Sequence, residues 1–165
     1  MQRLDQQSRV VQTKAMRYFL DTEYNGFGGA LLSLALVPED GGEELYLRFD
    51  CRDPIHPWVE RNVLPYIDHV PEAAKLPVMG REQSAQAIAM YFGQDLEPEI
   101  LADWPTDIEL LCGLLSFAPG RMVPLPDTRF RLLNTGTFSP AENSAVPHNA
   151  LHDARALRDH VVELE

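Results

Sequence analysis

The sequence predicts an α/β fold in which a mixed five-stranded sheet is flanked by helices. Three strand-like segments follow one another through short connections in the first third of the chain. Helical periodicity begins after them and then alternates with short apolar stretches. Three antiparallel strands, followed by strands that alternate with helices, are typical of a mixed sheet whose faces are covered by helices.

The first part of the chain supplies the three antiparallel strands. Met16–Leu20 is the first and central strand, and the glycine-rich segment Asn25–Gly29 is a turn. Ala30–Val37 is apolar and forms the second strand, and residues 39–42 (Glu-Asp-Gly-Gly) predict a hairpin connection. Glu43–Phe49 follows as the third strand, because apolar residues occupy alternate positions in it.

The pattern then changes to helices and shorter strands. Pro54–Leu64 carries apolar residues at helical spacing, and the proline-rich segment Val70–Pro77 is a loop. Arg81–Phe92 has an apolar stripe and predicts a helix. Ile100–Ala102 is a short strand candidate that leads into a leucine-rich helix at Asp107–Leu115.

The last part of the chain is less regular until its final helix. Met122–Leu125 is a short strand or a loop, and Asn134–Val146 is polar and irregular. Ala150–Leu164 predicts an amphipathic helix. Residues 1–15 are polar and form an N-terminal tail or leader, so that residues 16–165 make up a single domain.

Composition limits the classes of partner. The 165 residues include 14 basic and 25 acidic side chains, a net charge of −11, which argues against tight binding of long duplex DNA. An enzyme that acts on a few nucleotides remains compatible with this charge. No apolar run is long enough to span a bilayer. Cys51 and Cys112 fit no metal-ligand spacing and are expected to be buried thiols in a reducing cytoplasm.

Asp21 and Glu23 form an acidic pair at the end of the first strand. Residues two apart in a strand share a face, so both carboxylates project the same way if the strand continues through them. Two adjacent carboxylates repel each other and are costly to desolvate. A bound cation removes this conflict, and clusters of oxygen ligands suit Mg²⁺ or Mn²⁺.

Further acids occur at the boundaries of later elements. Asp107 opens the leucine-rich helix, and Asp103, at the end of the preceding strand, is a rival metal ligand. Asp153 lies in the final helix, five residues after His148. Helix capping and the helix dipole offer a purely structural explanation for acids at helix starts.

Together, these motifs resemble the DEDDh 3′–5′ exonuclease superfamily, which has a ribonuclease H-like fold. The resemblance rests on Asp21-x-Glu23, on Asp107, and on the final motif from His148 to Asp153, which is similar to the superfamily pattern His-x-Ala-Leu-x-Asp-Ala. It covers nearly the whole chain, whose short length resembles that of the small mycobacterial-type 3′–5′ exoribonucleases. Many members have Asn at the position of Asp103, so the sequence leaves open which acid of the second motif is the ligand.

The resemblance implies a metal-dependent 3′–5′ exoribonuclease that removes nucleoside 5′-monophosphates from RNA by two-metal-ion hydrolysis. It implies two Mg²⁺ or Mn²⁺ ions and His148 as general base. The ligands implied for these ions are Asp21, Glu23, Asp107 and Asp153. Aromatic faces at Tyr24 and Phe27, with the backbone at Thr22, are candidates for binding the 3′-terminal nucleotide. The expected partner is single-stranded RNA or a short oligonucleotide 3′ end; a homodimer remains open by analogy.

Other residues receive structural interpretations. Trp58 and Trp104 are expected in the core or an interface, and Arg129 and Arg131 as solvated charges. The other histidines are expected at the surface or as caps: His56, His69, His152 and His160. Two alternative functions remain open, a nucleotide or dinucleotide phosphohydrolase with the same metal cluster and a non-catalytic ribonuclease H-like binding scaffold.

Overall fold

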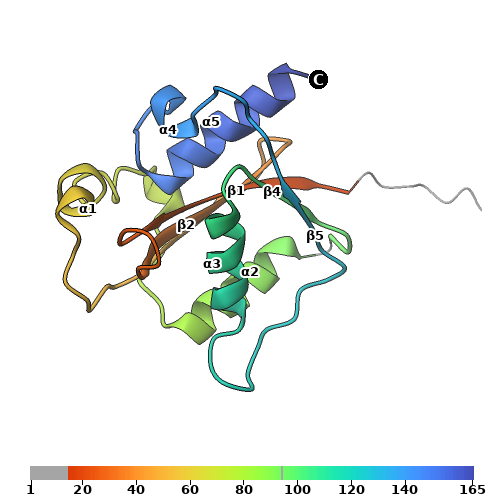
Figure 1. Cartoon of the computed structure of the whole chain (residues 1–165). Coiled ribbons are helices and arrows are strands. Elements are labelled where there is room, and N and C mark those ends of the chain that lie inside the picture. The colour runs from red at the N-terminus through yellow and green to blue at the C-terminus, as the bar shows by residue number, and fades with distance from the viewer. Residues whose placement is uncertain (1–14, 94) are drawn as a thin grey trace, which may run out of the picture.

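The computed structural model describes residues 15–93 and 95–165 and confirms the predicted fold class (Figure 1). Five strands form one mixed sheet in the order β3-β2-β1-β4-β5. Their bounds are β1 (Arg17–Tyr24), β2 (Leu31–Pro38), β3 (Leu45–Arg48), β4 (Glu99–Ala102) and β5 (Arg129–Leu132). The central strand β1 pairs antiparallel with β2 and parallel with β4. Because β3 is antiparallel to β2 and β5 is parallel to β4, the arrangement is ribonuclease H-like.

Helices cover both faces of this sheet (Figure 1). They are α1 (Pro57–Asn62), α2 (Arg81–Phe92), α3 (Pro105–Leu115), α4 (Pro140–Asn143) and α5 (Ala150–Glu163). Tyr18 and Leu20 of β1 pack into a cluster with residues of α2 and α3. The intervening Phe19 packs with Leu157 of α5, so α5 covers the opposite face.

Burial on both faces explains why the first half of β1 is apolar. Phe19 and Leu20 are completely buried, as expected for a central strand between two helical layers. The strand is longer than Met16–Leu20 and continues through Asp21 and Glu23 to Tyr24. The condition for the two carboxylates to share a face is therefore met.

The fifth strand lies outside the predicted elements. Met122–Leu125, predicted as a short strand or a loop, is irregular, and the strand lies at Arg129–Leu132, where Arg129 and Arg131 had been interpreted as solvated charges. All four residues of β5 are exposed at the edge of the sheet. An edge strand that pairs on one side and buries neither face needs no apolar pattern, so periodicity gave no signal for it.

Three smaller expectations are also corrected. The irregular segment Asn134–Val146 contains the short helix α4, and the loop Val70–Pro77 contains a 3₁₀ turn at Glu72–Ala74. Cys112 is exposed on α3 rather than buried, and Cys51 is half-buried. The predicted tail lies outside the described residues up to position 14.

The described helices have one further property in common. Within residues 15–93 and 95–165, none combines the length and apolar character needed to cross a bilayer.

Candidate metal centre and adjoining pocket

The C-terminal end of β1 carries Asp21 and Glu23 and is called the carboxylate end here. It extends beyond the parallel neighbour β4. The two strands pair from Arg17 to Phe19, and β4 ends at Ala102. On the other side, β1 and β2 remain paired, with a register shift between Glu23 and Tyr24. Irregular pairing of this kind is common beside active sites because it re-aims side chains.

Asp107 occupies the space that opens beyond the end of β4. It lies in the first turn of α3, which begins with Pro105, and its side chain is 2% exposed. The carboxylate Oδ1 accepts hydrogen bonds from the Thr22 backbone N at 3.1 Å and from the Thr22 hydroxyl at 2.6 Å. Thr22 therefore fixes Asp107 beside β1, and its hydroxyl serves this contact.

Asp153 reaches the same region from the opposite face of the sheet. It lies in the first turn of α5, whose N-cap Asn149 accepts hydrogen bonds from Leu151 N and His152 N. The Asp153 Oδ2 accepts a hydrogen bond from the His148 backbone N at 3.2 Å. His148 has a φ of 59°, a left-handed conformation that is uncommon for a residue other than glycine.

The structure brings the predicted acids together in two groups of three residues. One group contains Asp21, Asp103 and Asp107, and the other contains Glu23, His148 and Asp153. In each group, one potential ligand atom from every residue lies within 4.8 Å of the others. The sequence left open whether Asp103 or Asp107 is the ligand. The structure places both residues in the same group.

Burial raises the pKa of every carboxyl group in the cluster, and repulsion from other acids adds to this shift in all of them except Asp103. Burial, followed by the charge of Asp107, raises the pKa of Asp21 well above its usual range. Burial and the charge of Asp153 raise the pKa of Glu23 to about 8. Burial also raises the pKa of Asp107 to about 7, although its hydrogen bonds from Thr22 oppose the shift.

The remaining two acids follow the same direction. Burial raises the pKa of Asp153 to about 6, against the opposing effect of its hydrogen bonds, and burial raises the pKa of Asp103. The pKa of His148 is lowered by burial, which favours the neutral imidazole. Acids that resist ionisation for lack of positive charge form a site that a cation would stabilise.

Unpaired oxygens give a second indication that the cluster fits a cation. Within the described residues, four buried oxygens of the cluster have no hydrogen-bond partner: Asp21 Oδ2, Asp103 Oδ1, Asp107 Oδ2 and Asp153 Oδ1. Unpaired buried polar atoms are rare because their desolvation is not compensated. Acidic groups that can hold a metal ion are thus present, and the hard oxygen donors fit a divalent cation.

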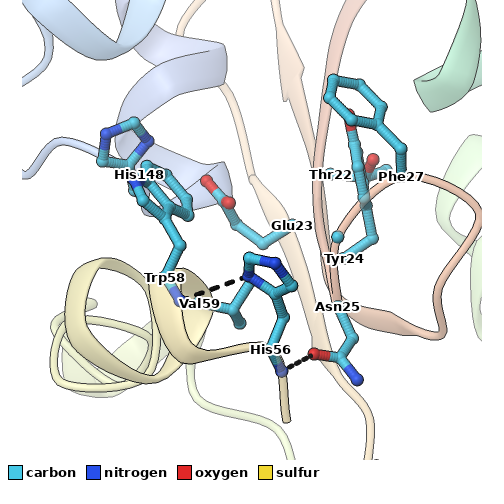
Figure 2. Close-up of a pocket in the computed structure, with 10 residues that line it drawn as sticks. Thr22, Glu23, Tyr24, Asn25, Phe27, His56, Trp58, Val59 and His148 are labelled. Carbon is cyan, nitrogen blue, oxygen red and sulfur yellow. Dashed lines mark hydrogen bonds between the residues drawn. The ribbon is translucent and has the colours of Figure 1, made fainter.

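A pocket of about 660 Å³ opens beside Glu23 and His148 (Figure 2). One wall is the segment from Thr22 to Phe27, and the other is formed by α1 and the residues around it. Its lining residues are Thr22, Glu23, Tyr24, Asn25, Gly26, Phe27, His56, Trp58, Val59 and His148. This volume is within the usual range for small-molecule sites.

The turn that follows β1 holds Phe27 at the rim of this pocket. Phe27 is 84% exposed, and its ring centroid lies 6.1 Å from that of Tyr24. A Cβ atom on Gly29 would lie 2.1 Å from the carbonyl oxygen of Asn25, so the turn requires glycine there. The predicted turn Asn25–Gly29 is confirmed, and the three predicted nucleotide-binding residues all line the pocket.

Trp58 was expected in the core or an interface, but it lines the pocket and is 44% exposed. Its ring meets the His148 ring edge to face, with centroids 4.9 Å apart (Figure 2). Trp104 is also exposed, so neither tryptophan lies in the core, and their place in an interface stays a prediction. Trp58 precedes the buried Val59 on a short helix, and a single tryptophan gives no sequence signal that separates a core position from a pocket wall.

His56 confirms the capping interpretation and also lines the pocket. Its Nδ1 accepts a hydrogen bond from Trp58 N, and its backbone N donates one to Asn25 Oδ1 at 2.8 Å. These contacts link the turn after β1 to α1, as Figure 2 shows. Asn25 was missed as a site residue because its role depends on a segment about thirty positions later.

The other histidines lie outside both groups. His152 Nε2 is 2.8 Å from the carbonyl oxygen of His69, and the His160 ring stacks on Phe138.

No protein-family model matches the chain, and a search of curated proteins finds no match either.

Proposed function

We propose that this protein is a metal-dependent 3′–5′ exoribonuclease of the DEDDh type, which releases nucleoside 5′-monophosphates from the 3′ ends of RNA. One observation carries the proposal. Carboxylates from β1, α3 and α5, distant in sequence, gather with His148 beside an aromatic pocket. Metal-assisted hydrolysis of a phosphodiester needs this combination of hard ligands, a base and a place for the terminal nucleotide.

The metal ligands of this proposal are the four acids that the sequence pointed to. Asp21, Glu23, Asp107 and Asp153 would hold two Mg²⁺ or Mn²⁺ ions. When bound, such ions supply an activated water and stabilise the charge that develops on the leaving oxygen. Thr22 positions Asp107 through two hydrogen bonds, and His148 N positions Asp153.

His148 is the proposed general base. Burial favours its neutral form, which has a free ring nitrogen to accept a proton from water near neutral pH. The left-handed backbone at this position and the edge-to-face contact with Trp58 orient the imidazole. Its grouping with Glu23 and Asp153 supports a role beside the ions.

The aromatic pocket is the proposed site of the 3′-terminal nucleotide. Tyr24 and Phe27 on one side and Trp58 on the other offer faces on which bases can stack. Stacking of this kind tolerates different bases and suits single-stranded substrates. The net charge of −11 favours short contacts with a strand end over extended binding.

One observation favours a second candidate, a nucleotide or dinucleotide phosphohydrolase with the same metal cluster. No Lys or Arg occurs among the residues that line the described pocket, so a long phosphate backbone has no basic track there. A small substrate would need no such track.

The decisive experiment uses a 5′-labelled single-stranded RNA oligonucleotide with Mg²⁺ or Mn²⁺, and EDTA as the metal-free control. A ladder that shortens from the 3′ end, with nucleoside 5′-monophosphates as products, is the expected result. The matched control is Asp21→Asn, which keeps the side-chain shape but removes a ligand charge. Turnover of dinucleotides alone would replace the proposal with the phosphohydrolase. Inactivity with both metals on all of these substrates would leave the binding scaffold.

A further inference from the structure

Asp103 lies in the junction between β4 and α3, next to the carboxylate end of β1. β4 ends at Ala102 and α3 begins at Pro105, so the position of Asp103 is fixed by the elements on both sides. This placement brings its carboxylate into one group with Asp21 and Asp107, with a ligand atom from each within 4.8 Å. The site thus contains one acid more than the four carboxylates of the proposed exonuclease motif.

A structural role for the Asp103 carboxylate finds no support in its contacts. The N-cap position of α3 is held by Trp104, and among the described residues no side chain caps this helix. Asp103 Oδ1 is buried, and no described residue offers it a hydrogen bond. A half-buried acid without a capping partner is destabilising in the absence of a cation.

A second, independent observation points to a ligand at this place. Asp107 is 2% exposed, and Thr22 satisfies its Oδ1, while its Oδ2 has no partner in the described part of the chain. A carboxylate that is held rigidly by one oxygen and left open at the other is prepared to bind a cation. Asp103 adds a further negative charge beside it.

We propose that Asp103 contributes a third carboxylate to a divalent-cation site with Asp21 and Asp107, and that this site binds its ion more tightly than the Glu23–His148–Asp153 group. The inference rests on the proposed two-ion function and assigns a residue outside the exonuclease motif to one ion. Three carboxylates give the first group a formal charge of −3. The second group, with a neutral imidazole, carries −2.

The difference in charge leads to a difference in affinity. Each added carboxylate strengthens the attraction for a divalent ion, so the group with three carboxylates should bind its ion more tightly than the group with two. The wild-type protein should therefore bind two Mn²⁺ ions with separable affinities. Asp103→Asn should weaken the tighter ion at least about 10-fold and leave the weaker ion unchanged, since loss of a supporting group typically costs 10- to 100-fold.

The test measures Mn²⁺ binding without nucleic acid, by the electron paramagnetic resonance signal of free Mn²⁺ and by calorimetry. Asp95→Asn is the matched control, because Asp95 also has a buried Oδ2 without a described partner but belongs to neither group. Circular dichroism checks the fold, and Asp103→Ser replaces Asp103→Asn if the latter does not fold.

The outcomes separate the two proposals. Selective weakening of the tighter ion in Asp103→Asn, with both ions retained in Asp95→Asn, supports the inference. Unchanged affinities in Asp103→Asn overturn the role of Asp103 and leave the exonuclease proposal intact. A wild-type protein that binds no Mn²⁺ overturns both.

Discussion

The two ends of β1 bury charge in opposite ways. At the start of the strand, Arg17 is 5% exposed, and its guanidinium donates to the carboxylates of Glu39 and Glu165 at 2.5 to 2.8 Å. At the other end, Asp107 is equally buried, and the charged groups around it are further carboxylates. The first end is neutralised by the protein itself.

This difference shows what the carboxylate end lacks. Hydrogen bonds to Glu39 and Glu165 raise the pKa of Arg17, so the charged form is favoured at that end although burial opposes it. At the carboxylate end, burial and repulsion favour the neutral acids. The fold pairs its charges at one end of the strand and leaves them unpaired at the other, where a cation could be held.

Removing one charge from the carboxylate end should have the largest effect. Asp21→Asn should lower the proposed exonuclease turnover at least about 1000-fold, or about 4 kcal/mol, because the lost carboxylate interacts with all the other acids of the cluster. The metal-free variant should unfold at a higher temperature than the wild type, since repulsion is relieved. RNA turnover and thermal unfolding in EDTA measure both effects. A variant that keeps its activity but loses stability would contradict this account of β1.

Substitution of His148 tests whether the group of Glu23, His148 and Asp153 only binds a cation or also transfers protons. His148→Ala should lower turnover about 100-fold, or about 2.7 kcal/mol, while Mn²⁺ affinity changes little. The turnover–pH profile should lose its ascending limb near the pKa of the imidazole. His152→Ala is the matched control, because His152 is the neighbour of Asp153 but lies outside the group. A variant at full rate across pH would rule out His148 as the base.

At the start of β1, where Arg17 is paired with carboxylates, removing a charge should lower the stability of the protein. Arg17→Met should destabilise the protein by about 2 kcal/mol, less than for a fully buried pair because Glu165 is partly exposed. Urea unfolding measures the loss, and divalent cations should not restore it. Arg48→Met, at an exposed ion pair with Asp68, should cost less than about 1 kcal/mol. Equal losses of stability in the two variants would show that the burial of Arg17 does not strengthen its ion pairs.

The pH dependence of stability should reveal the unpaired acids. Glu23, with its pKa raised from 4.5 to about 8, holds a proton in the folded protein over a range where the unfolded chain has released it, and Asp107 behaves alike. The metal-free protein should therefore lose stability as pH rises from about 4 to about 8, by at least about 1 kcal/mol. The lowered pKa of His148 acts in the opposite direction below about pH 6.5, but it is one group against several.

Urea unfolding at about pH 5 and pH 7.5, in EDTA and then in Mg²⁺, measures this dependence. Mg²⁺ should flatten or reverse the slope, because its ligands bind as carboxylates. If the metal-free protein became more stable between these two pH values, burial and repulsion would not raise the pKa values of the acids as proposed.

Much of the fold and the acids of the site could be predicted, because strong local patterns mark them. The core strands and α5 have apolar periodicity, and Asp21, Glu23, Asp107 and Asp153 stand at the ends of such segments. β5 could not be found, since an exposed edge strand carries no such pattern. The division into two groups depends on how far β1 extends past β4, which only tertiary pairing determines.

The residues of the candidate site lie far apart along the chain. Asp21 and Glu23 lie in the first strand, whereas His148 and Asp153 lie at the start of the last helix. During synthesis on the ribosome, α5 emerges after the strands of the sheet and has to dock onto β1 before the group of Glu23, His148 and Asp153 is complete. If the proposed activity holds, a nascent chain stays harmless to nearby RNA until translation of α5 is finished.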